Sequence, residues 1–404
     1  MPTTCNPLPT LAVNFLITMH RSEILMHLGE DREQYFHAVA PPIIQSSNFT
    51  FSHLKGFRQA MSDELAHHIY TRGNNPTVAI LRQKLAALEG TEDALVLSSG
   101  SAAVALAVLS QVQSGDHIVC VRKPYSWTHK LLAHWLPRFG VHTTFVDGTH
   151  AAHFEQALRP NTKLIYLESP NSLTFELQDL ATVAQIAKAH GIVTAIDNSH
   201  CSPIFQQPAR FGIDIVIHSG TKYLNGHSDV VNGVICTSRQ IIQTIFQNEF
   251  MTLGAIISPH DAWLILRGLR TLELRMQRSE ASARKVAAFL QEHPRIRQVL
   301  HPLMPDFPQY ALARKQMSGS GGLFSFLLDV NTLEDAERFF TKLKRFLLAV
   351  SWGGYESLIL PSAAFYRIPG KPDPPLPFQL VRIYVGLEDP QWLIEDLAQA
   401  LDNL

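Results

Sequence analysis

Four short segments of the chain carry side chains that could bind and activate a small organic substrate. Residues 98–103 read Ser-Ser-Gly-Ser-Ala-Ala, a turn of small residues whose backbone N–H groups, at the start of a helix, would suit a phosphate. Glu168 and Asp197 each directly follow an apolar run. Residues 219–223 read Ser-Gly-Thr-Lys-Tyr. Lys222, flanked there by hydroxyl groups, could form an imine with an aldehyde cofactor whose phosphate those hydroxyls hold.

Each segment also has an ordinary structural explanation. A serine-rich helix start can be a cap without a ligand, an acid after a strand can cap a helix or form a salt bridge, and Lys222 can be a surface lysine. A functional site is favoured over these structural explanations because the segments converge. Ligands of an open α/β sheet bind beyond the carboxyl ends of its strands. All four segments follow predicted strands, so we predict one site at that edge.

The elements that must position these residues alternate between short apolar runs and helical patterns. The runs are apolar throughout, as required for strands that are covered on both faces. This βαβ pattern predicts an α/β fold with a mostly parallel seven-stranded sheet and helices on both faces. The strands are predicted at residues 94–97, 117–121, 142–146, 163–167, 192–196, 213–217 and 233–237, and helices at 101–113, 126–139 and 176–190.

A second, smaller unit is predicted after residue 262. One long helix over residues 258–293 should lead to it, followed by an α+β layer with strands at 322–328 and 380–385 and helices at 333–343 and 391–401. Residues 1–68 show no βαβ repeat. The predicted division is an N-terminal arm with a first helix at 1–68, a cofactor-binding domain at 69–262 and a C-terminal α+β domain at 263–404.

The composition argues against several classes of function. The 404 residues include 34 basic and 35 acidic side chains, a net charge of -1, so no basic field would attract nucleic acid. The four cysteines form no C-x-x-C pair, which argues against zinc and favours a reducing cytoplasm. The apolar stretch at residues 11–18 is shorter than the about 20 residues that span a bilayer. We expect no metal, no nucleic acid and no membrane partner.

Seven stretches, taken in order, resemble the cysteine and methionine metabolism family of pyridoxal-phosphate enzymes, which have fold type I. The resemblance covers about residues 25–404 and implies pyridoxal 5'-phosphate as the cofactor. The amino-acid sequence of residues 168–174, 350–360 and 382–389 is similar to that of the cystathionine β-lyase subgroup. The matching stretches are residues 70–77, 98–103, 168–170, 196–198, 219–229, 258–270 and 351–358.

The resemblance implies roles in cofactor chemistry. Lys222 should hold the cofactor as an imine and later take the Cα proton, with a pKa depressed from the usual value of about 10.4. Asp197 should pair with the ring nitrogen, and Tyr125 should stack on the ring and help to deprotonate the incoming amine. The phosphate should be held by Gly100, Ser101, Ser219 and Thr221 and, from a neighbouring subunit, by Tyr70 and Arg72.

The resemblance also implies a substrate site and an assembly. Arg382 should hold the α-carboxylate of an amino-acid substrate in a bidentate pair. Ser351 should orient that carboxylate or Lys222, while Trp352 and Tyr70 should line the substrate pocket. Because Tyr70 acts across subunits, a homodimer is the minimum assembly, and a homotetramer is expected.

The implied reaction is α,β-elimination of L-cystathionine to homocysteine, pyruvate and ammonia, a step of methionine biosynthesis, with side activity on L-cysteine and L-cystine. Relatives that work at Cγ tend to carry an acid before the serine of Ser-Leu-Gly-Gly; here Val350 and Trp352 flank Ser351. They also tend to carry Gly-Gly-Thr or Gly-Cys-Thr after the stacking tyrosine, where residues 126–128 read Ser-Trp-Thr. The alternatives are a γ-synthase or γ-lyase of the family and a non-catalytic regulatory paralogue that binds the cofactor.

Overall fold

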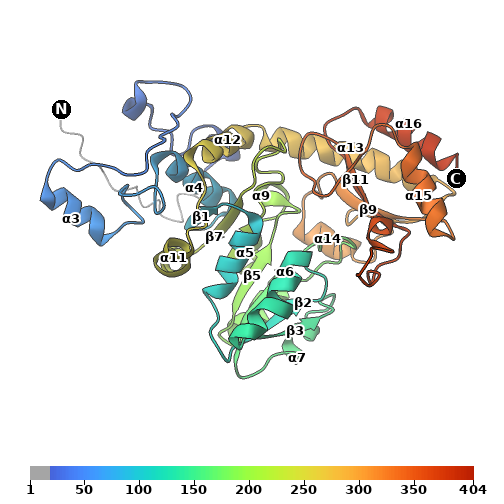
Figure 1. Ribbon diagram of the computed structural model, residues 1–404, viewed down its shortest axis with the longest axis horizontal. Coiled ribbons are helices and arrows are strands. Elements are labelled where there is room, and N and C mark those ends of the chain that lie inside the picture. Colours follow the sequence, from blue (N-terminus) through green and yellow to red (C-terminus); the bar gives the residue numbers. More distant parts are fainter. Residues whose placement is uncertain (1–18) are drawn as a thin grey trace.

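The structure, a computed structural model, describes residues 19–404 and contains two β-sheets joined by long helices (Figure 1). The expectation for residues 11–18, and for the first part of the arm, lies outside the described residues. No helix within residues 19–404 is long and apolar enough to cross a membrane.

The larger sheet has seven strands in the order β1-β7-β6-β5-β4-β2-β3. Strand β7 runs antiparallel to both of its neighbours, and all other pairs are parallel. The predicted mostly parallel sheet is therefore confirmed, and each predicted strand is present. The strands are β1 (Asp93–Leu97), β2 (His117–Val121), β3 (His142–Val146), β4 (Thr162–Glu168), β5 (Val193–Asp197), β6 (Ile215–His218) and β7 (Gly233–Thr237).

Helices cover this sheet, and their ends follow local sequence signals. Helix α4 starts with Pro76 after the capping residue Asn75 and ends at Gly90, whose φ of 74° suits glycine. Strands β2, β6 and β7 are buried along their whole length, as two covered faces require. The helices are α4 (Pro76–Glu89), α5 (Gly100–Leu109), α6 (Ser126–Lys130), α7 (Ala152–Gln156), α8 (Leu180–Ala189), α9 (Ser202–Phe205), α10 (Arg239–Ile245) and α11 (Met251–Leu253).

Two predicted helices of this unit need correction. The predicted helix 126–139 is regular only over α6 and continues as a π-helical turn, Leu131–Trp135, and a 3-10 turn, Leu136–Phe139. The predicted helix 176–190 starts only at Leu180, because the Asp179 side chain caps it by accepting the N–H of Thr182.

The second sheet has five strands in the order β10-β11-β12-β9-β8, antiparallel except for the pair β10 and β11. It has its own apolar core with α13, α15 and α16. Strands β8, β10 and β11 were not predicted. The elements are α12 (Pro259–Leu269), α13 (Leu272–Glu292), β8 (Ile296–Leu300), α14 (Tyr310–Gln316), β9 (Leu323–Leu328), α15 (Leu333–Lys342), β10 (Leu347–Leu348), β11 (Leu358–Pro361), β12 (Leu380–Tyr384) and α16 (Pro390–Leu401).

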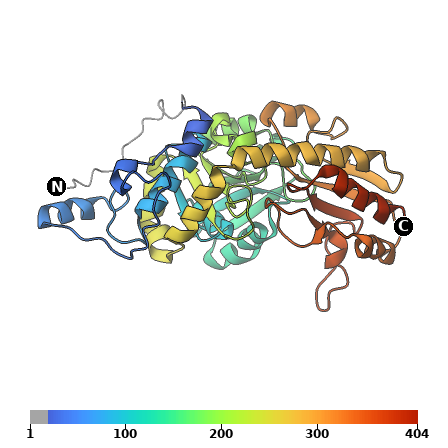
Figure 2. The ribbon, with the colours of Figure 1, turned by 90° about the horizontal axis from the view of Figure 1, so that it is seen from above.

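The single helix predicted over residues 258–293 is wrong, because the chain breaks at Arg270 and Thr271 into α12 and α13. Helix α12 packs on α4 of the larger unit, whereas α13 continues along the second sheet. Figure 2 shows α13 extending from the larger unit to the C-terminal one. The break therefore lets one segment serve both units.

The N-terminal part of the described chain extends from the side of the larger sheet that lies away from the second sheet (Figures 1 and 2). It contains α2 (Arg21–Met26), a 3-10 turn (Arg32–Tyr35) and α3 (Leu54–Ser62). Several of its large apolar side chains are exposed, led by Phe36 at 99% and Val39 at 80%. We call the exposed apolar residues Phe36, Val39, Leu54, Phe57 and Met61 the arm surface.

Helix α2 is attached to α4 by a buried lysine. Lys84 is 1% exposed, and its Nζ donates to the carbonyl oxygens of Ile24 at 3.0 Å and Leu25 at 3.1 Å. The same Nζ lies 3.2 Å from Glu30 Oε1. Because these carbonyls belong to the open end of α2, Lys84 satisfies acceptors that the helix leaves unpaired.

Replacing this lysine should loosen the N-terminal segment. We expect Lys84→Met to lower the free energy of unfolding by about 2 kcal/mol, because two buried carbonyls lose their donor. The midpoint of urea unfolding, followed by circular dichroism, measures this loss. Lys188→Met, at an exposed position of α8, is the control and should change stability by less than about 0.5 kcal/mol. Equal midpoints for the two variants would contradict the role assigned to Lys84.

Candidate active site

The predicted site residues of the larger sheet gather at the carboxyl ends of three adjacent strands. Glu168 ends β4 and Asp197 ends β5, and the two are paired in register. Strand β6, which ends at His218, lies beside β5 and leads directly into the segment of Ser219 and Lys222. Three of the four segments singled out in the sequence therefore reach the same edge of one sheet.

Lys222 is held between the two units. Its Nζ donates to Ser351 Oγ at 2.5 Å and lies 5.6 Å from the centre of the Trp352 ring. Gly353 packs against the lysine backbone so closely that a Cβ there would lie 2.9 Å from Lys222 Cα. The predicted neighbourhood of Lys222, Ser351 and Trp352 is thus present.

Burial sets the protonation of this lysine. The pKa of Lys222 is lowered to about 8, first by burial and then by the positive charge of Arg382, while Asp197 opposes the change. At pH 7 roughly a tenth of the amine is therefore uncharged and able to act as a nucleophile or base.

The two acids at the strand ends are bound differently. Asp197 Oδ1 accepts the N–H of Ser199 at 2.9 Å and its hydroxyl at 2.5 Å. Glu168, 5% exposed, accepts the N–H of Tyr125 at 2.7 Å and the hydroxyl of Ser172 at 2.6 Å. Sequence reasoning had marked Glu168 without giving it a role, and the structure makes it the anchor of Tyr125.

Burial raises the pKa values of both acids. Burial and the charge of Asp197 raise the pKa of Glu168 to about 8. Burial also raises the pKa of Asp197, but the hydrogen bonds from Ser199 and the charges of His218 and Lys222 act in the opposite direction. Since Asp197 has the greater cationic support, it is the acid of the pair that ionises first.

Arg382 and Tyr125 face this pair of acids. Arg382 lies on β12 of the second sheet, and its Nη1 donates to the carbonyl oxygen of Ser172 at 3.4 Å. Burial lowers the pKa of Arg382 to about 10, against the charges of Glu168 and Tyr125. The pKa of the Tyr125 phenol is raised by burial and by Asp197, while Arg382 lowers it. These mutual effects place the four groups together.

The turn at residues 98–103 both caps a helix and leaves backbone donors free, the two roles that the sequence allowed. Ser99 caps α5, since its hydroxyl accepts the N–H of Ala102 at 3.1 Å. Within residues 19–404, however, the N–H groups of Gly100 and Ser101 have no partner. Gly100 also lies against Ser219, where a Cβ would meet that of the serine at 2.8 Å. The free N–H groups of Gly100 and Ser101, beside Ser219, form a small open set of donors that we call the cradle.

Three predicted site residues are not joined to this cradle. The Thr221 hydroxyl donates instead to the carbonyl oxygen of Asn232 at 3.1 Å, so it closes its own loop. Tyr70 and Arg72 are exposed, and the guanidinium carbon of Arg72 lies 5.3 Å from the centre of the Tyr70 ring. No hydrogen bond or ion pair of the described chain connects either of them to the Lys222 group. Their predicted roles therefore remain predictions.

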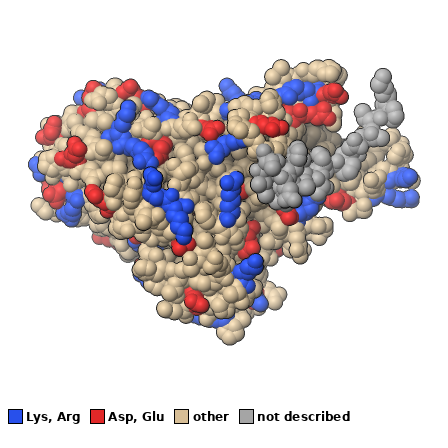
Figure 3. All heavy atoms as spheres, turned by 180° about the vertical axis from the view of Figure 1, so that it is seen from behind, with Lys and Arg blue, Asp and Glu red and all other residues tan. Residues whose placement is uncertain are grey.

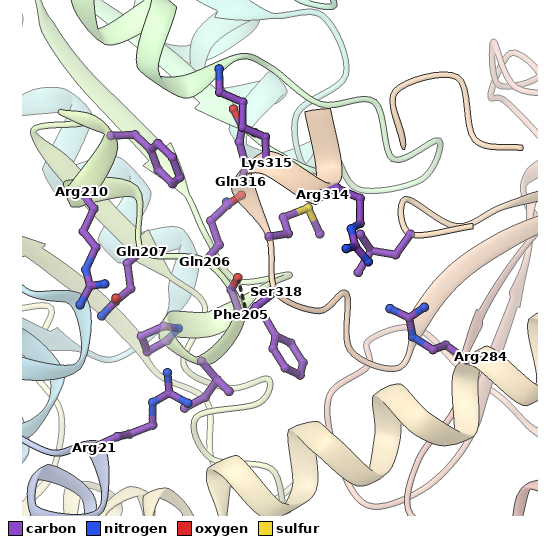
Figure 4. A pocket seen from close by; sticks show the side chains of 15 residues that line it. Arg21, Phe205, Gln206, Gln207, Arg210, Arg284, Arg314, Lys315, Gln316 and Ser318 are labelled. Carbon is purple, nitrogen blue, oxygen red and sulfur yellow. Dashed lines mark hydrogen bonds between the residues drawn. The ribbon is translucent and has the colours of Figure 1, made fainter. Parts of the chain in front are cut away.

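A separate cleft of about 540 Å³ shares no lining residue with the Lys222 group (Figure 4). Arg21 and Arg284 in its wall are paired with Glu273 and Glu280 at 2.8 and 2.7 Å, so part of its charge is neutralised. Its basic residues are Arg21, Arg210, Arg284, Arg314 and Lys315.

Other features set limits on the chemistry of the chain. On the face shown in Figure 3, basic and acidic side chains are interspersed, in keeping with the net charge of -1. Across residues 19–404 no three His, Cys, Asp or Glu side chains gather as a metal site would require.

Sequence reasoning missed one buried pair next to the site. His218 Nε2 lies 2.5 Å from Glu89 Oε1, although the two residues are 129 positions apart. The only sequence signal was an acid at the end of an otherwise apolar helix pattern and a histidine directly before the predicted phosphate-binding serine.

The chain is similar to known proteins along nearly its whole length. A family described as Cys/Met metabolism PLP-dependent enzyme matches residues 22–402. An L-methionine gamma-lyase of Pseudomonas deceptionensis is 39% identical over 93% of this chain and 96% of the relative. A cystathionine gamma-lyase of Bacillus subtilis is 37% identical over 96% of this chain and 100% of the relative.

A solved structure extends the likeness to the whole fold. The crystal structure of metB from Corynebacterium glutamicum superposes with a TM-score of 0.89 at 34% identity, covering 96% of this chain and 99% of that one. A match of this extent in sequence and in fold leaves no part of either sheet outside the likeness. The chain belongs to the Cys/Met metabolism family of PLP-dependent enzymes.

Proposed function

We propose that the chain is a pyridoxal-phosphate-dependent carbon–sulfur lyase that carries out α,β-elimination on L-cystathionine and releases homocysteine, pyruvate and ammonia. One observation carries the lyase proposal. Lys222, which is half-buried and has a pKa of about 8, lies near Arg382, whose guanidinium has free donors, and near the ionisable Asp197 at the edge of the larger sheet. The proposal of β-elimination rests further on Trp352, whose ring adjoins Lys222.

The residues at this edge of the larger sheet have the donors and acceptors that pyridoxal phosphate requires. The unpaired N–H groups of Gly100 and Ser101, with the adjoining Ser219 hydroxyl, would hold its phosphate at the start of α5. Asp197 would pair with the ring nitrogen, and Lys222 would hold the aldehyde carbon through Nζ. When bound, the cofactor supplies an electron sink for the carbanion at the substrate Cα.

Lys222 is the proposed base for the Cα proton. Its lowered pKa leaves neutral amine available near physiological pH, which is the condition for efficient proton transfer. Ser351 donates no proton to Nζ here; it accepts one at 2.5 Å and so fixes the direction of the amine. The β-elimination needs only this one proton removed from carbon, and a single lysine can perform it.

Arg382 is the proposed partner of the substrate α-carboxylate. A single long hydrogen bond, to the carbonyl of Ser172 at 3.4 Å, occupies its guanidinium in the described part of the chain. The remaining N–H groups match the two oxygens of a carboxylate. Tyr125, held by Glu168, would stack on the cofactor ring and assist the incoming amine.

A γ-elimination is the second candidate, favoured by the names of the relatives. Two relatives at 39% and 37% identity are called L-methionine gamma-lyase and cystathionine gamma-lyase. The γ route requires a second proton to leave Cβ. The pair Val350 and Trp352 around Ser351, unlike the pattern expected of Cγ enzymes, supports the β route for this chain.

We further propose that the active unit is at least a dimer. Tyr70 and Arg72 are exposed and lie apart from the Lys222 group, while the arm surface leaves five large apolar side chains uncovered. A second copy that covers the arm surface would remove this apolar area from water and could bring Tyr70 and Arg72 to the partner's cradle.

The keto acid formed from L-cystathionine separates the two eliminations. We expect pyruvate as the main product, because β-elimination leaves a three-carbon fragment, and chromatography of the keto acid identifies it. Lys222→Ala is the control and should reduce the rate at least about 10⁴-fold, since the base is lost. A main product of 2-oxobutyrate would contradict β-elimination. No turnover by the unaltered protein would favour the regulatory alternative.

Cofactor uptake should report the pKa of Lys222. Only the neutral amine attacks an aldehyde, so the uptake rate of cofactor-free protein should rise about tenfold per pH unit below pH 8 and level off above it. Stopped-flow absorbance measures the rate. Arg382→Gln removes a charge that lowers this pKa, so its midpoint should move to higher pH.

The matched control for uptake is Arg338→Gln, at an exposed position of α15, which should leave the midpoint in place. A midpoint near the ordinary lysine pKa of about 10.4 in the unaltered protein would refute the depressed value.

Mixed oligomers test the shared site. Lys222→Ala and Arg72→Ala should each be inactive alone, but mixed dimers that hold one subunit of each variant should have about half of the activity, because one of their two sites is intact. Activity is measured on protein purified by a different tag on each subunit. Full activity of Arg72→Ala alone, or no recovery in the mixture, would show that Arg72 does not act across subunits.

A further inference from the structure

A buried acid and a buried histidine adjoin the site and have no part in the proposed reaction. Glu89 ends α4 and His218 ends β6, and each is 1% exposed. His218 Nε2 lies 2.5 Å from Glu89 Oε1, and Asn198 Nδ2 donates to the same oxygen at 3.0 Å. The two side chains form a compact pair that solvent does not reach.

Local structure does not explain why Glu89 is there. The carboxyl end of a helix carries a partial negative charge, so a carboxylate at that end is disfavoured. Glu89 Oε2 and His218 Nδ1 also find no hydrogen-bond partner within residues 19–404. A buried carboxylate with so few donors needs a cation beside it, and His218 is the neighbour that can supply one.

The pair is connected to Asp197 along both adjacent strands. On β6, the residue after His218 is Ser219, whose N–H donates to Ser199 Oγ at 2.6 Å. The Ser199 hydroxyl in turn donates to Asp197 Oδ1 at 2.5 Å. On β5, Asp197 is followed directly by Asn198, the residue that donates to Glu89. A short chain of hydrogen bonds and neighbouring residues therefore links the pair to the Asp197 carboxylate.

The pair also acts on Asp197 by charge. Burial raises the pKa of Asp197, and the charges of His218 and Lys222 lower it. Burial already outweighs these charges, so without His218 the pKa of Asp197 would rise further and Asp197 would take up a proton at higher pH. The other titratable groups around this centre are Glu168, Tyr125 and Tyr166 near Asp197, and Cys201 and Cys236 near Glu89.

We propose that Glu89 and His218 are positioning residues that keep Asp197 ionised and fixed where it meets the ring nitrogen of the cofactor. The inference rests on the proposed pairing of Asp197 with that nitrogen. An ionised Asp197 holds the nitrogen protonated, and a protonated ring is the stronger electron sink. The pair thus acts on the reaction through Asp197 and does not touch the substrate.

The test replaces the charged pair with a neutral one of similar shape. The double variant Glu89→Gln with His218→Gln keeps a hydrogen bond between two amides and leaves no unpaired buried charge. Its cofactor dissociation constant at pH 7 should rise about tenfold, as is typical when outer partners of a binding group are removed. This loss should be greatest at low pH and fade as the pH rises, because Asp197 then ionises without help.

A spectroscopic signal separates positioning from simple stability. With cofactor labelled by ¹⁵N in the ring, the nitrogen resonance of the unaltered protein should be that of a protonated pyridine, and in the double variant at low pH it should move towards that of neutral pyridine. A double variant that only melts earlier, with unchanged resonance and pH dependence, would overturn the inference. If the double variant does not fold, Glu89→Gln alone is measured in the same way.

A control variant distinguishes this inference from the proposed function. Asp197→Asn should shift the ring nitrogen resonance and weaken cofactor binding on its own. If Asp197→Asn changes neither quantity, the proposed role of Asp197 fails. If Asp197→Asn changes both and the double variant changes neither, Asp197 keeps its role and the inference about Glu89 and His218 is wrong.

Discussion

The hydrogen bond between Lys222 Nζ and Ser351 Oγ joins the two sheets at the point where the proposed chemistry occurs. Lys222 follows the larger sheet, whereas Ser351 and Arg382 belong to the smaller unit. The next residue, Tyr223, is fully buried, and its hydroxyl accepts the N–H of Gly322 just before β9. The docking of the two units therefore creates the site, and any change in that docking would move Lys222 relative to Arg382.

This docking encloses charges that must offset one another. Glu168 and Asp197 end adjacent strands and raise each other's cost of ionisation, while Lys222 and Arg382 approach from the loop and from the second sheet. Burial displaces each pKa towards neutrality, and the opposite charges pull it back. The result is a lysine that is partly neutral near pH 7 beside an acid that can still ionise, which is the combination the proposed reaction needs.

The sequence predicted what depends on local pattern and missed what depends on distant contacts. The seven strands of the larger sheet were predicted because most are apolar runs bounded by turn residues, and their carboxyl ends indicated the site; β3 is the exception, with a partly exposed His-Thr-Thr-Phe-Val sequence. The break at Arg270 and Thr271 was missed because the helical pattern continues through it. Neither the Thr221 contact with Asn232 nor the pairing of Glu89 with His218 could be predicted, because such pairs arise from tertiary packing alone.

The scarcity of charge in this chain, 17% of residues, has a structural counterpart in the N-terminal segment. Phe36 and Val39 are almost fully exposed there, although an isolated chain gains nothing from placing large apolar groups in water. Tyr70 and Arg72 follow in the same part of the chain and lie apart from the Lys222 group. The same surface would thus have two roles. A second copy that covers these apolar residues would also bring its cradle close to Tyr70 and Arg72. Assembly and activity would then depend on the same contacts, so that a monomer would have both an exposed apolar surface and an incomplete site.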